Sequence, residues 1–273
     1  MNYYEILRDI KDSPQIRTLL YPYGYYKFKK FSAEYVKSMY PEKIKKFHDI
    51  HAGERCFIIG NGPSLLVEDL EKIKGEYSFG ANKIYNIYPK TSWRPTYYLC
   101  MDYMSMTEEI LSEMNKIEAD YAFLNWQQHG KIHAADKLFF CNFNPRYVIN
   151  FWDDKKVTFS EDCSLYVDNA RTVTYSAIQL AVYMGFSEIY LLGMDANYPF
   201  YKDGKGRKHR TEATKAHFEN GGYDRVDYMV KKTNETGFRV AREYCESHGI
   251  MIKNATRGGK LEIFERVEFD SLV

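Results

Sequence analysis

The sequence predicts an α/β fold built on a single doubly wound, mostly parallel sheet of the Rossmann-like kind. Short apolar runs alternate with segments of helical periodicity along most of the chain, which is the pattern of a parallel sheet covered by helices. Glycine and polar residues directly follow several of these runs, as they do where strands of such a sheet end in ligand-binding loops. With 273 residues, the chain is long enough for one large domain and an appendage.

The alternation predicts a series of strands and four helices. The strands are expected at residues 56–60, 77–81, 96–101, 121–126, 137–142, 188–193 and 251–254. The helices are expected at residues 64–73, 104–117, 174–184 and 224–248. The stretch from 201 to 215 is rich in glycine and lysine and is expected to form a long loop.

The N-terminal part of the chain differs from the rest in composition. It is aromatic and basic and has few aliphatic side chains. We therefore divide the chain into a helical N-terminal segment, residues 1–50, and a main α/β domain, residues 51–273. The segment is expected to pack on the core or on a second subunit of a homo-oligomer. The other expectation is a peripheral contact with an anionic membrane surface, where lysine and aromatic side chains act together.

The composition indicates which partners and which cellular compartment to expect. The 38 lysine and arginine residues balance 37 aspartate and glutamate residues, so the total charge predicts no nucleic-acid partner. The five cysteines are scattered and have no metal-ligand spacing, which fits reduced thiols in a cytoplasmic protein. There is no signal-peptide pattern and no apolar run of about 18 residues. The expected location is cytoplasmic, with membrane association only through the N-terminal segment.

The motif "IIGNGPSL" joins the first expected strand to the first expected helix. Gly60 and Gly62 would let the backbone turn sharply and approach a ligand without a Cβ atom in the way. Asn61 would offer donors and an acceptor to a base, a ribose or a phosphate. Ser64 would cap the helix, whose free N–H groups would attract an anion. The motif is neither a P-loop nor the full dinucleotide fingerprint, and a purely structural turn stays open.

Polar residues also stand at the next two strand ends. Asn82 follows the second expected strand and Asp102 follows the third. Both would converge with Asn61 on one crevice, because parallel strands end at the same edge of a sheet. The Asp102 carboxylate would hold a ribose or sugar hydroxyl. No metal site is predicted, since no second acidic residue is close to it in the sequence.

The second half of the chain repeats this arrangement. Thr172 and Thr174 stand at the start of a helix, where hydroxyl and N–H groups bind anions. Asp195 follows the sixth expected strand, and Tyr198 and Tyr201 come soon after it. Phenol groups are good donors to a leaving phosphate, although each tyrosine taken alone would more often be a packing residue.

The tail "NATRGGKLEIF" places Arg257 and two adjacent glycines after the last expected strand. Two glycines permit a tight turn with exposed N–H groups. The planar fork of an arginine binds phosphate in a way that lysine cannot reproduce. Arg257 is therefore a candidate contact for a phosphate or an anionic acceptor, with a simple chain-reversing turn as the alternative.

Several motifs together resemble a known family. "IIGNGPSL" with "GANK", then "RTVTYSAIQLAVYMGFSEIYLLGMDANY" and "AHFENGGY", resembles the bacterial sialyltransferases of glycosyltransferase family 42. The ending "IKNATRGGKLEIF" resembles a related group of bacterial proteins found among surface-polysaccharide genes, labelled 6-hydroxymethylpterin pyrophosphokinase-like after an archaeal member. The resemblance covers roughly residues 55–264. It implies the variant GT-A fold of those sialyltransferases and makes residues 51–273 a nucleotide-binding catalytic domain.

The resemblance also implies a role for each matching residue. His217 would be the general base that takes the proton of the acceptor hydroxyl. Tyr198 and Tyr201 would donate to the leaving phosphate. Asp102 stands where the sialyltransferases have an asparagine, which leaves the donor sugar open. The implied nucleotide-binding residues are Gly60, Asn61, Gly62, Ser64, Asn82, Asp102, Thr172, Thr174 and Asp195.

The implied activity is sugar transfer from a nucleotide donor, with a CMP-sugar favoured, to a glycan acceptor in bacterial surface-polysaccharide assembly, without a cofactor. His129 and His133, near the end of a strand, are within reach of an acceptor site. One alternative is Mg²⁺-dependent pyrophosphoryl transfer from ATP to 6-hydroxymethylpterin, in which Asp102 and Asp195 would hold the metal. The other is a non-catalytic nucleotide-sugar-binding protein.

Overall fold

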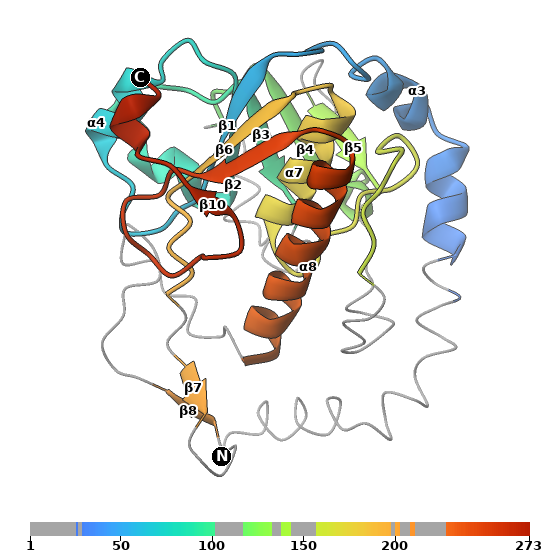
Figure 1. Ribbon diagram of the computed structural model, residues 1–273. Coiled ribbons are helices and arrows are strands. Elements are labelled where there is room, and N and C mark those ends of the chain that lie inside the picture. The colour runs from blue at the N-terminus through green and yellow to red at the C-terminus, as the bar shows by residue number, and fades with distance from the viewer. Residues whose placement is uncertain are drawn as a thin grey trace.

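Eight parallel strands form one open sheet in the computed structural model (Figure 1). The structure describes residues 26, 29–101, 117–132, 138–142, 157–197, 200–202, 208–210 and 228–273. Every strand expected from the sequence is present, with ends shifted by no more than one residue, which confirms the α/β fold class. The strands are β1 (Arg55–Ile59), β2 (Ser78–Ala81), β3 (Tyr97–Cys100), β4 (Tyr121–Asn125), β5 (Leu138–Cys141), β6 (Glu188–Leu192), β9 (Met251–Asn254) and β10 (Glu265–Arg266).

The order of the strands places a switch point at the centre of the sheet. That order is β10-β9-β6-β1-β2-β3-β4-β5. The chain moves outward from β1 to β5 and then returns to β6, which pairs with the other side of β1. In open parallel sheets, the ligand crevice lies beyond the carboxyl ends of the two strands where the order reverses. Here those strands are β1 and β6.

Helices cover both faces of the sheet. Helices α7 (Val173–Tyr183) and α8 (Tyr228–Ser247) lie together on one face (Figure 1). The other face packs against α4 (Val67–Lys72) and the 3₁₀ helices η1 (Asn82–Lys90) and η5 (Phe269–Ser271). The helix expected at 104–117 lies outside the described residues, apart from its last position. No helix in the described part of the chain has both the length and the apolar character needed to cross a bilayer.

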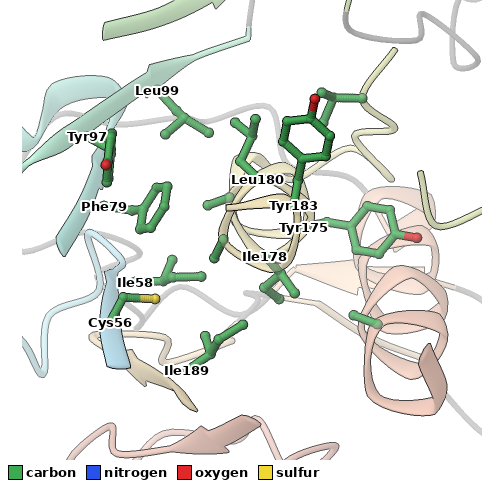
Figure 2. Close-up of a cluster of buried hydrophobic side chains, with 14 of the residues drawn as sticks. Cys56, Ile58, Phe79, Tyr97, Leu99, Tyr175, Ile178, Leu180, Tyr183 and Ile189 are labelled. Carbon is green, nitrogen blue, oxygen red and sulfur yellow. The ribbon is translucent and has the colours of Figure 1, made fainter. Parts of the chain in front are cut away.

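The alternation of side chains along β1 explains why both faces are covered. Cys56 and Ile58 point toward α7, where Figure 2 shows them facing Ile178 of that helix. Phe57 and Ile59 belong to the core cluster on the opposite face. Strands that are buried on both faces are apolar at successive positions, which is why the run after Arg55 indicates a central strand.

The N-terminal segment covers the edge strand β5. Residues 29–36 are helical and lead into α3 (Tyr40–Lys45). Tyr40 packs edge-on against Phe140 at 5.1 Å between ring centroids, and Phe47 packs against Phe139 at 4.9 Å. These contacts reach both faces of β5, and a covered edge strand is protected from pairing with other chains. A second subunit or a membrane as partner of this segment stays a prediction.

The structure corrects the loop expected at 201–215. Strand β7 (Phe200–Lys202) pairs with β8 (Lys208–Arg210) as an antiparallel hairpin. Each strand is only three residues long, so neither gives a readable alternation, and the glycine- and lysine-rich composition indicates a loop. The 3₁₀ helix η1 was not expected either, since it contains Pro89, which normally ends a helical segment.

Candidate functional site

Three loops meet beyond the carboxyl ends of β1, β6 and β9. The N–H of Gly62 donates to the carbonyl of Gly193 at 2.9 Å, and the N–H of Lys260 donates to the carbonyl of Asp195 at 2.7 Å. The backbone itself therefore holds these loops against one another at the switch point of the sheet. The loops are residues 60–64, 193–197 and 255–260.

The glycines of the first motif are required by the neighbouring loop. A Cβ atom on Gly62 would lie 1.9 Å from Oδ2 of Asp195 and 2.5 Å from the carbonyl oxygen of Gly193. A Cβ atom on Gly60 would lie 2.5 Å from the same carbonyl oxygen. The space that the sequence suggests for a ligand at these glycines is filled by the loop after β6. The physical reason for the glycines is therefore loop packing, while their assignment to a nucleotide site stays a prediction.

Ser64 does not cap the helix that follows it, so that expectation was wrong. Helix α4 begins at Val67, and its N-cap residue is Leu66, which makes no side-chain capping bond. Leu65 is buried in the core, and the chain is not helical at this residue. The Ser64 hydroxyl instead donates to Oδ2 of Asp195 at 2.7 Å, and its N–H donates to the same oxygen at 3.3 Å.

Asn61 and Asn82 lie at neighbouring strand ends. Nδ2 of Asn61 donates to the carbonyl of Ala81 at 3.0 Å, which ties the end of β1 to the end of β2. Oδ1 of Asn61 is buried and accepts no hydrogen bond from the described residues. Asn82 has a left-handed φ of 52°, which asparagine adopts more readily than most residues. Its carbonyl accepts a hydrogen bond from the Tyr98 hydroxyl at 2.8 Å.

Acceptor groups dominate this part of the crevice. The Nδ2 group of Asn61 is engaged by the Ala81 carbonyl, whereas its Oδ1 is an acceptor without a described partner. The carboxylate of Asp195, which is 7% exposed, already occupies the hydroxyl and the N–H of Ser64. A phosphate here would meet a carboxylate of like charge. Hydroxyl and amine groups of a ligand are the better partners for these acceptors.

The start of α7 lies against the loop after β6. Thr172 is the N-cap residue, and its hydroxyl makes no capping hydrogen bond. The Thr174 hydroxyl donates to the sulfur of Met194 at 3.5 Å. Ala170 and Arg171, just before the helix, have left-handed φ angles of 37° and 64°. Left-handed backbone of this kind is often found at ligand sites. The anion-binding role of the two threonines stays a prediction.

Arg257 is bound by two carboxylates of the chain. Its guanidinium donates to both oxygens of Asp69 at 2.9 Å and to Asp270 at 2.8 Å. The Asp69 side chain is only 2% exposed. Hydrogen bonds from Arg257 and Lys72 hold the pKa of Asp270 well below its ordinary range. The geometry favours a structural turn that ties the tail to α4 and η5, and the phosphate contact stays a prediction.

The two glycines after Arg257 form the expected tight turn. Gly258 and Gly259 have left-handed φ angles of 69° and 75°. Arg266 donates to their carbonyl oxygens at 2.6 and 3.2 Å. Sequence reasoning missed Arg266 because no local pattern links a residue of β10 to a turn that precedes it by several residues.

The catalytic residues implied by the resemblance, and Asp102 of the predicted nucleotide site, fall outside the described side chains. Asp102, Tyr198 and His217 are not among the described residues, and of Tyr201 only the backbone is described, as part of β7. Their roles stay predictions. Among the side chains that the structure describes, no three histidine, cysteine, aspartate or glutamate residues gather in a way that would hold a metal ion.

The fold is similar to solved glycosyltransferase structures. The MAf glycosyltransferase from Magnetospirillum magneticum AMB-1 matches 86% of this chain with a TM-score of 0.52 at 15% identity, and this chain spans 39% of that protein's length. The sialyltransferase CstII from Campylobacter jejuni, solved with cytidine-5'-monophosphate, matches 79% of this chain and 85% of its own, with a TM-score of 0.42 at 16% identity. At such low identity the first likeness shows a shared fold and nothing finer. No curated protein sequence matches the chain.

A family profile matches the sequence itself. It is described as 6-hydroxymethylpterin diphosphokinase MptE-like and matches residues 30–200. That range contains the loop after β1, the asparagines at the ends of β1 and β2, the start of α7 and the loop after β6. Because the matched range is more than half of the chain, this protein belongs to the MptE-like family.

Proposed function

We propose that this protein is a glycosyltransferase that binds a nucleotide sugar, with a CMP-sugar favoured, beyond the carboxyl ends of β1 and β6. The observation that carries the proposal is the pair of acceptors at these strand ends, Oδ1 of Asn61 and the carboxylate of Asp195. They lie at the switch point of a parallel sheet, where nucleotides bind in folds of this kind. The acceptor would be a glycan of bacterial surface-polysaccharide assembly.

The acceptor pair supports a defined orientation of the nucleotide. Ribose hydroxyls and the exocyclic amine of cytosine can both donate to Asn61 and Asp195. Uracil has a carbonyl in place of that amine, so a cytidine nucleotide fits better than a uridine nucleotide. The phosphate would then face away from Asp195, toward the start of α7 with its hydroxyl groups at Thr172 and Thr174, where the helix dipole favours an anion.

The reaction follows from the residues that the resemblance assigns. The acceptor hydroxyl attacks the anomeric carbon of the donor, and the bond from that carbon to the phosphate oxygen breaks. His217 takes the proton of the attacking hydroxyl. Tyr198 and Tyr201 donate hydrogen bonds to the phosphate as its charge develops. These groups supply acid–base and electrostatic catalysis, so the proposed transfer needs no metal ion. The proposed location is cytoplasmic.

A second candidate function comes from the family description. Pyrophosphoryl transfer to 6-hydroxymethylpterin would need Mg²⁺ and carboxylates to hold it. Asp102 and Asp195 are the carboxylates that would serve. Oδ2 of Asp195 already accepts two hydrogen bonds from Ser64, which leaves this oxygen less able to bind a metal ion.

Ligand binding tests the acceptor pair directly. Thermal-shift and calorimetric titrations with cytidine, CMP, UMP, ATP and pyrophosphate should rank CMP first, with cytidine above pyrophosphate. Asn61→Ala should abolish the response to CMP. The control is Asn142→Ala, just after β5, which loses amide hydrogen bonds from Nδ2 to the Leu165 carbonyl at 3.1 Å and to the Ser32 hydroxyl at 3.3 Å. Equal loss of CMP binding in both variants would mean that Asn61 acts only through stability.

Turnover separates the candidate functions. The purified protein would be assayed with CMP-, UDP- and GDP-sugars and a glycan acceptor, and with ATP and 6-hydroxymethylpterin, each with and without Mg²⁺. Metal-independent consumption of a CMP-sugar is the expected result. Activity with ATP and the pterin alone would replace the proposal by the second candidate.

A further inference from the structure

A rigid turn follows β4 at the same edge of the sheet as the crevice. Nδ2 of Asn125 donates to the carbonyl of Met101 at 2.7 Å, while its Oδ1 accepts from the N–H of Gln127 at 3.0 Å. Asn125 thereby caps the 3₁₀ helix η3 (Trp126–Gln128). Because that side chain is 3% exposed, the turn is fixed from within, and side chains on it are presented in one orientation.

His129 comes directly after this turn, and one of its ring nitrogens is hydrogen-bonded to the backbone. Its Nδ1 lies 2.7 Å from the carbonyl oxygen of Trp126. A carbonyl can only accept, so Nδ1 carries the proton, and Nε2 of the neutral ring is left as an acceptor. The residue is exposed, so this acceptor is presented to solvent at the carboxyl edge of the sheet.

The His129 ring also forms the outer layer of an aromatic stack. It lies parallel to the Trp126 ring at 3.6 Å between centroids and an angle of 5°. Trp126 is buried and packs against Tyr35 and Tyr40 of the N-terminal segment. One face of the imidazole is therefore covered by a supported indole, and the Phe140 ring lies edge-on at 6.5 Å between centroids. The residue as a whole remains exposed.

The position of this ring relative to the crevice matters for a two-substrate reaction. Strand β4 is three places from β1 in the sheet, a separation of roughly 14 Å at the usual spacing of strands. A nucleotide sugar with its base at the end of β1 would direct its sugar along the strand ends. A second ligand resting on His129 would then approach from the opposite side.

We infer that His129 forms a subsite for the acceptor glycan. A pyranose ring would rest its apolar C–H face on the face of the imidazole opposite Trp126, and one of its hydroxyl groups would donate to Nε2. This inference rests on the proposed function for its role in transfer. His129 is then a binding and positioning residue for the acceptor, and the predicted general base remains His217.

The chain contains a matched control for this geometry. His248, just after α8, stacks on Tyr244 at 4.0 Å and 14°, with Nδ1 at 2.8 Å from the Tyr244 carbonyl oxygen. It is exposed like His129 but precedes β9 and therefore lies at the amino edge of the sheet. His248→Ala removes an equivalent stacked imidazole without touching the proposed subsite.

Steady-state kinetics with varied acceptor provide the first test. His129→Ala should raise the KM for the acceptor roughly 5- to 100-fold, as expected for one stacking contact and one hydrogen bond. The KM for the donor and the slow hydrolysis of the donor by water should stay within twofold. His129→Phe should recover part of the loss because it keeps the ring face. An acceptor KM that is equal in the parent, His129→Ala and His248→Ala proteins would overturn the inference.

Direct binding distinguishes failure of this inference from failure of the proposed function. Saturation-transfer NMR with methyl glycosides of galactose, glucose and N-acetylglucosamine needs no turnover. Glycoside signals that are lost in His129→Ala and kept in His248→Ala would support the subsite even if no sugar nucleotide were consumed. No glycoside signal with the parent protein, or equal signals in both variants, would remove it.

Discussion

The carboxylate of Asp195 accepts hydrogen bonds from both the hydroxyl and the backbone N–H of Ser64, a residue 131 positions earlier in the chain. This link joins the loop after β6 to the loop after β1 at the switch point of the sheet. Both donors of Ser64 are thereby engaged within the protein. The first motif therefore has a packing role, and its role in binding a nucleotide stays a prediction.

Ser64→Ala should lower the free energy of unfolding by roughly 1.5–3 kcal/mol, since it removes a hydroxyl that donates to a buried carboxylate. Urea unfolding at neutral pH measures the change. Ser271→Ala serves as the control, because the Ser271 hydroxyl donates only to an exposed backbone carbonyl, that of Glu268. That control should stay within about 0.5 kcal/mol of the parent. Equal effects of the two substitutions would show that the link to Asp195 contributes little.

Gly237→Ala should destabilise the protein although alanine favours helices. A Cβ atom at Gly237, inside α8, would lie 2.5 Å from Cβ of Ala170. The overlap costs roughly 1–3 kcal/mol, more than the gain of about 1 kcal/mol in helix propensity. Adding Ala170→Gly to Gly237→Ala should restore stability, because it removes the opposing Cβ atom. Glycine also tolerates the left-handed φ of 37° at this position. Thermal unfolding of the single and double variants measures this, and a double variant no more stable than Gly237→Ala would disprove the contact.

Arg257→Lys should reduce stability by roughly 1–3 kcal/mol, because lysine cannot reproduce the two parallel bonds to Asp69. Nucleotide affinity should change by less than about twofold, since the described donors of Arg257 point to carboxylates. Unfolding curves and calorimetric titration with CMP measure the two quantities. Normal stability with weakened nucleotide binding would instead support the phosphate contact that the sequence suggests.

Glu71 should make stability depend on pH in the acid range. Hydrogen bonds from the Thr91 hydroxyl and from the N–H and hydroxyl of Ser92 lower the pKa of Glu71 to about 2 in the folded protein. Its contribution is therefore present above the pKa of the unfolded chain, near 4.3, and is lost as the pH falls toward 2. Urea midpoints from pH 5 to pH 2 should fall less steeply for Glu71→Gln than for the parent. Glu243→Gln, at an exposed position of α8, should keep the parent slope.

The sequence determined the α/β class and the strands of the sheet except the two-residue β10, because their signals are local. A central strand such as β1 needs successive apolar side chains for two buried faces, and that run can be read directly. The start of α7 at Thr172 and the tight turn at Gly258 and Gly259 were predictable for the same reason. The three-residue strands of the β7–β8 hairpin were missed because they are too short to show any period.

Only the tertiary structure decided what the polar groups at the strand ends do. Nothing near Ser64 in the sequence indicates that its hydroxyl is bound by Asp195, and nothing near Arg257 indicates Asp69, 188 positions away. The sequence shows which glycines, hydroxyl groups and charged groups follow the strands. Hydrogen bonding, however, depends on which atoms lie within about 3 Å of each other. The path of the chain through the whole fold sets those distances, and so it decides which groups the protein uses itself and which remain for a ligand.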